Sequence, residues 1–296
     1  MAEMRTILAA VDLEAGSNVV VQRAARLAAE HRAKLVLLHV VDGEALAEAA
    51  AGPYRSEDDL KGQLERQGKR EIAALLEPAS DVSGGAVEIR FGKPYDVITS
   101  LAGDLGTDLV VIGSGRRQTL SERVLGSTAD RVVRASPVPV LIVRGAADRP
   151  YRRVAAAIDF SPPSRAAAME AASLAPGARL ELVHAVSIPL SFEQAMLRAG
   201  TSLADIERYR TSKRQRAEAE LAAFAKELTA GPRAELRLID GEPGQVLVRL
   251  ATDRDVDLLA LGPNGRGAVL RALLGSVTQR VLREAGCDVL IVPVAE

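Results

Sequence analysis

Residues 256–282 read VDLLALGPNGRGAVLRALLGSVTQRVL, and this stretch places two glycine clusters between a mostly apolar run and a helical pattern. The run at 256–261 is typical of a strand that is buried on both faces of a parallel sheet. Gly262 and Gly265 follow it directly, and Gly275-Ser276 precede the helical pattern. The stretch therefore predicts a strand, a glycine loop and a helix start, which is the local plan of an α/β domain.

The same plan occurs twice in the chain. TDLVVIGSG at 107–115 matches VDLLALGPNG at 256–265, and LGSTADRVVRASPVPVLIV at 125–143 matches LGSVTQRVLREAGCDVLIV at 274–292. Asp12 matches Asp159, an offset of 147 residues (159 − 12). Such a period is too long for a solenoid repeat. We therefore expect two copies of one domain, residues 1–146 and residues 147–296.

Short apolar runs alternate with segments of helical spacing throughout both copies. The runs expected to be strands are 5–11, 34–40, 85–90, 108–112, 138–143, 152–158, 179–185, 234–239, 256–261 and 288–293. Segments expected to be helical include 18–32, 57–77, 95–105, 204–229 and 268–285. The alternation predicts a doubly wound, five-stranded parallel sheet in each copy, sandwiched by helices. Residues 43–56 and 186–202 are expected to be the longest irregular stretches.

The bulk composition limits the classes of function. Of 296 residues, 48% are hydrophobic and 26% charged, which predicts a full core. The net charge of −1 argues against a nucleic-acid partner, which would need a basic face. The single cysteine, Cys287, excludes an intrachain disulfide or a cysteine zinc cluster and is expected to be a buried thiol. Because neither a membrane-length apolar run nor a signal peptide is found, we expect a cytoplasmic protein without a membrane partner.

Chemistry is expected at the carboxyl ends of the strands, where ligands of such sheets bind. Ser276 and Gln279 fit a capping box, and Ser127 with Asp130 is a looser version. A helix start exposes N–H groups, and glycines let a phosphate approach the backbone closely. The alternative is that these glycines serve turn geometry alone. No GxxxxGK[ST] occurs, and no GxGxxG follows the first strand, so neither a P-loop nor a Rossmann dinucleotide site is predicted.

At these residues the chain resembles the universal stress protein family in its tandem two-domain form. The nucleotide-binding branch of that family carries G-x2-G-x9-G-[ST] after the fourth strand, and Gly262, Gly265, Gly275 and Ser276 match it. The Asp-Phe-Ser turn at 159–161 and the G-x-P at 241–243 also match. The resemblance covers both halves nearly from end to end.

The resemblance implies a five-stranded sheet of order 3-2-1-4-5 and a site for ATP or another adenine nucleotide, with Mg²⁺ bound alongside. Adenine would lie near the first-strand Asp and the end of the second strand, and the phosphates on the glycine loop and helix start. The implied residues of the second copy are Asp159, Ala185, Gly262, Gly265, Gly275, Ser276, Val277 and Thr278. Those of the first copy are Asp12, Val40, Gly113, Gly126 and Ser127. Ser276 and Thr278 could add hydroxyls to phosphate or Mg²⁺.

The first copy departs from the motif, because Arg116 stands where the second glycine belongs. A side chain there could block close approach of a phosphate, or Arg116 or Arg117 could pair with phosphate directly. We expect the first site to be weaker or empty.

Other residues point to structural roles. His39 and His184 occupy equivalent strand ends and are expected to pack or hydrogen-bond there, and no metal ligands are expected. No acid pair, nucleophile elbow or metal-spaced cluster is found, so no catalytic residues are expected. The last strands, 138–143 and 289–292, would be sheet edges that need to be covered. They are expected to pair in an intramolecular pseudo-dimer, with a further homodimer possible.

The predicted function is ATP binding by a regulatory or stress-response protein. The alternatives are a nucleotide-free interaction scaffold or a slow ATP-hydrolysing enzyme.

Overall fold

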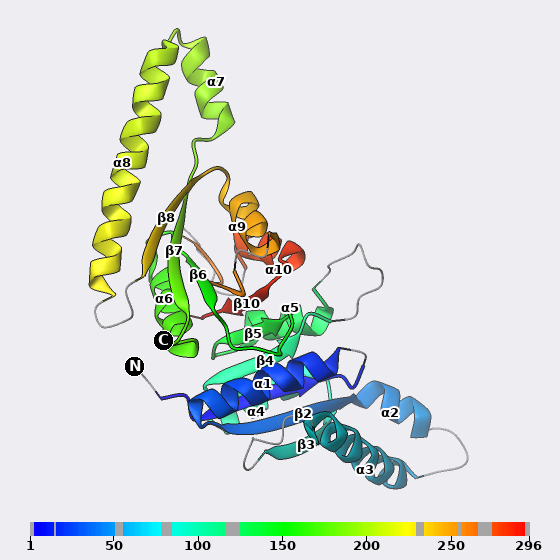
Figure 1. Cartoon of the computed structure of the whole chain (residues 1–296). Coiled ribbons are helices and arrows are strands. Elements are labelled where there is room, and N and C mark those ends of the chain that lie inside the picture. The colour runs from blue at the N-terminus through cyan, green and yellow to red at the C-terminus, as the bar shows by residue number, and fades with distance from the viewer. Residues whose placement is uncertain are drawn as a thin grey trace. The chain divides into compact units, whose positions relative to one another are not determined.

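The structure is a computed structural model, and it describes residues 3–14, 16–50, 56–77, 85–115, 125–228, 234–253, 256–265 and 274–293. The chain divides into two compact units. The first unit comprises Met1–Pro150 together with Asp288–Glu296, and the second comprises Tyr151–Cys287. Figure 1 labels most of the strands and helices of both.

The first unit is built on a parallel sheet. Its strands are β1 (Thr6–Val11), β2 (Lys34–Asp42), β3 (Ala86–Gly92), β4 (Leu109–Gly113) and β5 (Val140–Val143). They lie in the order β3-β2-β1-β4-β5, and all four neighbouring pairs are parallel. This confirms the predicted order 3-2-1-4-5. The sheet core is dry, because Ile7, Leu37 and Leu141 are fully buried.

The second unit repeats this arrangement. Its strands are β6 (Arg153–Ala157), β7 (Arg179–Val186), β8 (Glu235–Asp240) and β9 (Leu258–Leu261), parallel in the order β9-β6-β7-β8. This order is the 4-1-2-3 part of the predicted sheet. The last strand of the sequence, β10 (Asp288–Ile291), groups with the first unit and pairs antiparallel with β5, Val289 opposite Ile142. The edge of β5 is therefore covered by a strand from the other end of the chain.

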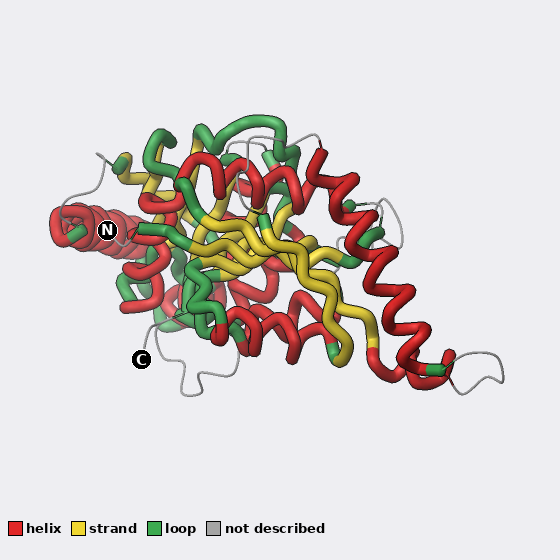
Figure 2. The backbone as a smooth tube through the Cα atoms, turned by 90° about the horizontal axis from the view of Figure 1, so that it is seen from below, coloured by secondary structure: helices red, strands yellow, loops and turns green. Residues whose placement is uncertain are grey.

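Helices connect the strands and flank them, as the red and yellow segments of Figure 2 show. Those of the first unit are α1 (Ser17–His31), α2 (Gly43–Ala50), α3 (Glu57–Leu76), α4 (Pro94–Asp104) and α5 (Ser127–Ala135). Those of the second unit are α6 (Pro162–Leu174), α7 (Leu190–Arg198), α8 (Leu203–Glu227), α9 (Pro243–Thr252) and α10 (Ser276–Glu284). None of the helices in these described ranges is both long and apolar enough to span a membrane.

The two copies share the same hydrogen-bonding arrangement at the amino ends of their strands. Asp108 Oδ2 accepts hydrogen bonds from the backbone N–H groups of Arg5 (2.7 Å) and Thr6 (2.8 Å). The matching Asp257 accepts from Arg152 (2.8 Å) and Arg153 (2.9 Å). Each carboxylate thus fixes the start of the first strand against the fourth, so the repeat extends from sequence to individual contacts.

Two expectations of irregular structure are wrong. The stretch 43–56 begins with α2, and 186–202 contains α7. In α2, good helix formers follow Asp42, whose Oδ1 accepts from the backbone N–H of Glu44 at 2.8 Å. In α7, Phe192 packs on Tyr209 of α8 with ring centroids 5.9 Å apart. Local capping and contact with the next helix outweigh the weak apolar pattern of these segments.

Candidate functional site

The first-strand aspartate of each copy is held by the start of the next helix. Asp159 Oδ1 accepts hydrogen bonds from the backbone N–H (3.0 Å) and hydroxyl of Ser161, which is the N-cap residue of α6. Asp12 Oδ1 accepts from the Ser17 hydroxyl at 2.9 Å. Ser161 precedes two prolines, and a serine followed by proline is a sequence signal that could have located this N-cap. Both carboxylates are therefore fixed at the carboxyl ends of central strands.

The residue after each aspartate has a left-handed backbone, with φ of 65° at Phe160 and 60° at Leu13. This conformation is rare for a bulky side chain, and it turns the chain sharply off the strand. In the second unit the turn packs Phe160 against His184, with ring centroids 4.6 Å apart, and against Phe224 at 6.0 Å. The sequence marked the Asp-Phe-Ser turn at 159–161, but it did not indicate the left-handed backbone of Phe160, which orients Asp159.

The second strand brings Ala185 and Val40 level with the aspartates. Val11 lies opposite His39 in the register, so the residues that come next on the two strands are Asp12 and Val40. Ala157 lies opposite Val183, and the same register continued by two residues sets Asp159 beside Ala185. The predicted pairs on the first and second strands are thus neighbours in both units.

The two strand-end histidines have structural hydrogen bonds, as predicted. His184 Nδ1 donates to the carbonyl of Ile158 at 2.7 Å, and His39 Nδ1 donates to that of Val11 at 2.8 Å. Cys287 is also buried, as predicted. Within the described residues, no group of three or more His, Cys, Asp or Glu side chains is arranged to hold a metal ion.

Two glycines of the second loop lie against other parts of the protein, with little room for a side chain. A Cβ atom on Gly262 would lie 2.5 Å from Pro163 Cβ, at the start of α6. A Cβ atom on Gly265 would lie 2.8 Å from Asp159 Oδ2. Both distances are far below van der Waals contact. The loop after β9 therefore lies directly against Asp159 and the start of α6, which brings three elements of the predicted site together.

Gly275 is different, because nothing in the described part of the protein excludes a side chain there. Its φ of −63° and ψ of 153° are open to any residue. A Cβ atom on it would lie 3.5 Å from Asn264 Cα and 3.6 Å from the Pro263 carbonyl oxygen, which are ordinary contacts. The N–H of Gly275 donates to that carbonyl at 2.8 Å and joins the loop to the helix. Apart from its place before the helix, where glycine is one of the common residues, the fold gives no reason for the absence of a side chain at Gly275.

The predicted capping boxes are wrong. The N-cap residues are Gly275 in α10 and Gly126 in α5, without side-chain capping bonds, and Ser276 and Ser127 are the first helical residues. The Gln279 side chain donates instead to the Leu274 carbonyl at 2.7 Å. The glycine, rather than the serine, takes the extended conformation that an N-cap needs.

This start of α10 has backbone donors that the helix itself does not use. Its first intrahelical bond runs from the Gln279 N–H to the Gly275 carbonyl at 2.9 Å, so the N–H groups of the three preceding residues come before it. These are the predicted phosphate-binding residues Ser276, Val277 and Thr278. The Thr278 hydroxyl is buried and donates to the Gly262 carbonyl at 2.9 Å. That hydrogen is therefore used to bind the loop to the helix.

The first copy has the same helix start but a tighter loop. The Gly126 N–H donates to the Ser114 carbonyl at 2.9 Å, as Gly275 does to Pro263. Gly115 has a φ of +90°, and a Cβ atom on it would lie 2.7 Å from Gly126 Cα. The loop backbone therefore lies directly against the helix start. Arg116 and Arg117, on which the prediction for this copy depended, lie outside the described residues.

Comparison with known proteins identifies the family. The universal stress protein family model matches residues 3–144 and again residues 150–293. The chain belongs to the universal stress protein family. A universal stress protein of Mycolicibacterium smegmatis is 27% identical over 301 residues, 97% of this chain and 96% of that protein.

Single-domain members match one copy. Universal stress protein G of Escherichia coli O157:H7 is 34% identical over 146 residues, 47% of this chain and 99% of that protein. Among solved structures, a universal stress protein of Archaeoglobus fulgidus has a TM-score of 0.70 at 18% identity, covering 99% of both chains. At this identity the structural likeness supports the fold alone.

Proposed function

We propose that this universal stress protein binds an adenine nucleotide, preferably ATP, in its second unit. Asp159 and the backbone beside Ala185 would receive the base and ribose. Gly262, Gly265, Gly275 and the first N–H groups of α10, at Ser276, Val277 and Thr278, would receive the phosphates. A helix N-terminus bordered by glycines suits an anion, because its free N–H groups and dipole both favour negative charge.

The observation that carries the proposal is the difference between Gly275 and the other two glycines of the motif. Gly262 and Gly265 are explained by contacts within the protein. Gly275 has ordinary contacts and an ordinary backbone among the described residues, yet it lies at the start of α10 beside the donors that the helix does not use. A ligand that approaches this backbone closely would account for the missing side chain.

Magnesium would be bound chiefly by the phosphates. The exposed Ser276 is placed to add a hydroxyl. The buried Thr278 hydroxyl donates to Gly262 and could contribute only a lone pair. Magnesium would supply charge neutralisation of the triphosphate.

In the first unit we propose a weaker or empty site at Asp12, Val40, Gly113, Gly126 and Ser127. The closer approach of the loop to the helix start supports this, because a Cβ atom on Gly126 would lie 3.1 Å from Gly115 Cα, whereas one on Gly275 would lie 3.5 Å from Asn264 Cα. The first unit would then serve mainly as a structural partner. The antiparallel pairing of β10 with β5 supports an intramolecular pseudo-dimer, to which homodimerisation could be added.

The nucleotide would act as a regulatory ligand in a cytoplasmic stress response, and the protein would not be a dedicated enzyme. The alternative functions are a nucleotide-free scaffold and a slow ATPase. A scaffold would carry no nucleotide and take up none. An ATPase would release ADP with Mg²⁺ above a protein-free blank, and would lose this activity on replacement of Asp159.

The test is the amount of nucleotide released on denaturing the purified protein, measured by chromatography and mass spectrometry. We expect about one adenine nucleotide per chain, lost in Gly275→Val. Gly177→Val is the matched control, because a Cβ atom at Gly177 meets nothing within 4 Å. Absence of nucleotide in the wild type, with no uptake of added ATP, would favour the scaffold.

A further inference from the structure

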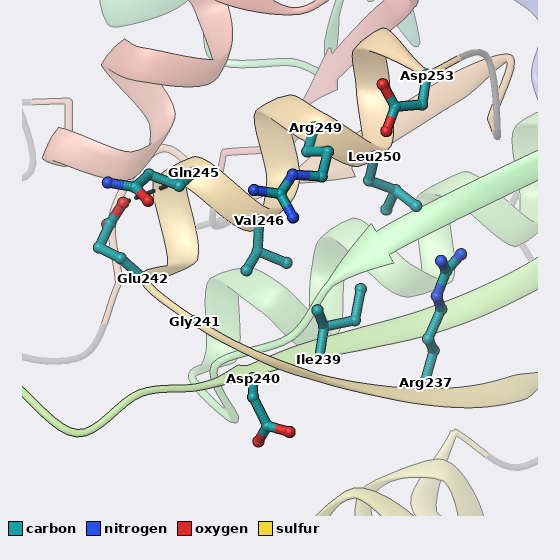
Figure 3. Close-up of a pocket in the computed structure, with 10 residues that line it drawn as sticks. All are labelled: Arg237, Ile239, Asp240, Gly241, Glu242, Gln245, Val246, Arg249, Leu250 and Asp253. Atoms are coloured by element: carbon teal, nitrogen blue, oxygen red, sulfur yellow. Dashed lines mark hydrogen bonds between the residues drawn. The ribbon is translucent and has the colours of Figure 1, made fainter.

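A second concave site lies between β8 and α9, and it shares no residue with the candidate nucleotide site. Its volume is about 270 Å³. Figure 3 shows Arg237 and Ile239 rising from β8 towards α9, from which Val246, Arg249 and Leu250 face them. We call this site the β8–α9 groove.

The floor of the groove is apolar. Ile239 is half-buried, Val246 is 9% exposed and Leu250 is 3% exposed. Asp240 points to the opposite side of β8 in Figure 3, where it pairs with Arg214 of α8 at 2.5 Å. The strand therefore presents one apolar and one basic side chain to the groove, Ile239 and Arg237.

Most charged groups around the groove already have partners. Arg237 pairs with Glu181 of β7 at 3.2 Å. Glu242 accepts from the backbone N–H groups of Gly244 (2.9 Å) and Gln245 (2.8 Å), and also pairs with Arg280. These contacts fix the groove walls and satisfy the carboxylate of Glu242.

Two charged residues of the groove, Arg249 and Asp253, are exceptions. Arg249 lies in the last turn of α9, and its guanidinium has neither a hydrogen bond nor an ion pair within the described part of the chain. Asp253, one turn further along α9, forms no ion pair with it across these same residues. The groove thus combines an apolar floor with a cation available to a carboxylate, for which a guanidinium is the best-matched side chain.

The groove also lies beside an open strand edge. β8 is the terminal strand of the order β9-β6-β7-β8, and in the described ranges it pairs with β7 alone. An edge strand presents unpaired N–H and C=O groups to an added strand. The groove volume falls just below the roughly 300–1,000 Å³ of pockets that hold whole small molecules, so it suits one or two side chains of a peptide better.

We propose that the β8–α9 groove binds an extended peptide segment of a partner protein as an additional strand beside β8. An apolar side chain of the peptide would occupy the floor formed by Ile239, Val246 and Leu250. An acidic side chain on the same face of the peptide, two residues away, would pair with Arg249. In this mode the backbone supplies affinity and the pockets for alternate side chains supply specificity.

The first copy is an internal comparison. Counting from the matched Gly92 and Gly241, the position of Arg237 is taken by Glu88 and that of Arg249 by Ser100. The first unit therefore lacks both guanidinium groups of the groove, and an acidic peptide is expected to bind one unit only.

The test is a selection of random peptides displayed on phage against the full chain. We expect an enriched pattern with an apolar residue two positions from Asp or Glu. Selected peptides, made synthetically, should bind about tenfold or more weakly to Arg249→Glu, the change expected for reversal of one paired charge. Arg283→Glu is the matched control, because Arg283 is the exposed basic residue in the last turn of α10.

Hydrogen exchange with a selected peptide supplies the second readout. We expect slower exchange of backbone amides in Glu235–Asp240 when the peptide is bound. Three results would overturn the proposal: no enriched pattern, a pattern whose peptides bind Arg249→Glu as tightly as wild type, or binding without protection of β8. None of these results depends on nucleotide, so the nucleotide proposal is tested separately.

Discussion

Replacement of Asp288 by alanine should weaken the attachment of β10 to the first unit. Asp288 Oδ1 accepts from the backbone N–H groups of Arg144 and Gly145, each at 2.7 Å. Its Oδ2 accepts from Arg23 Nε at 3.1 Å, and the two side chains are 4% (Arg23) and 1% (Asp288) exposed. Because water does not reach this pair, the variant leaves a buried guanidinium and two backbone amides without their acceptor.

The magnitude follows from these contacts. Removing one partner of a buried ion pair typically costs about 3–5 kcal/mol. Arg23 keeps hydrogen bonds to the carbonyls of Arg149 (2.9 Å) and Ala146 (2.6 Å), which offset part of the loss. We therefore expect the free energy of unfolding of the first unit to fall by about 3 kcal/mol, the lower end of that range.

The assay is urea unfolding followed by circular dichroism, together with hydrogen exchange at Asp288–Ile291. The control is Glu65→Ala, which breaks a solvent-exposed pair with Lys69 and should leave the free energy of unfolding almost unchanged. A loss below about 1 kcal/mol for Asp288→Ala, with unchanged exchange of β10, would refute the reasoning.

Three further predictions use other contacts. The buried Thr107 hydroxyl has no hydrogen-bond partner within the described residues, and the matching residue of the second copy is Val256, so Thr107→Val should raise the free energy of unfolding by about 1 kcal/mol in urea. Gly262→Ala should lower it by about 1–3 kcal/mol, because its Cβ would meet Pro163, whereas Gly177→Ala should not. The Arg210 guanidinium donates hydrogen bonds to Glu193 and lowers the pKa of that carboxyl. The stabilisation that this ion pair gives to the folded state is therefore present above the usual carboxyl pKa of about 4.3. It is lost as pH falls through the lowered pKa of Glu193. NMR shifts of Leu190–Arg198 should then show α7 loosening from α8 at acid pH, and Glu193→Gln should remove this pH dependence.

The sequence predicted the strands well because buried parallel strands have continuous apolar runs. The prediction 34–40 corresponds to Lys34–Asp42, and 179–185 to Arg179–Val186. It failed for α2 and α7, whose stability depends on a capping carboxylate and on contact with a neighbouring helix. The partner of Asp288 could not be predicted either, because Arg23 lies 265 residues away and no pattern links the two.

The residues of the candidate site could be predicted from the sequence, but the physical reason for each glycine could not. The motif marks Gly262, Gly265 and Gly275 alike, and only the folded structure separates two that the protein's own packing favours from one that it does not. The serine at the helix start suggested a cap, whereas the glycine before it has the N-cap conformation. A motif read from sequence therefore combines constraints from folding with constraints that we attribute to the ligand.

This distinction bears on why the first copy departs from the motif. If its loop followed the path of the second, a side chain at Arg116 would meet Asp12 as a Cβ on Gly265 would meet Asp159. The loop instead has a left-handed glycine, Gly115, in place of Asn264, and it lies against Gly126.

Restoring the first site should accordingly need both changes. Arg116→Gly alone leaves Gly115 free to keep its left-handed contact with Gly126, and Gly115→Asn alone keeps an arginine at the position of the motif's second glycine. In Gly115→Asn/Arg116→Gly, an asparagine Cβ could not remain 2.7 Å from Gly126 Cα, so the loop must open. We expect released nucleotide to rise from about one to about two per chain in the double variant only. A rise in Arg116→Gly alone would show that the arginine, and not the closed loop, empties the first site.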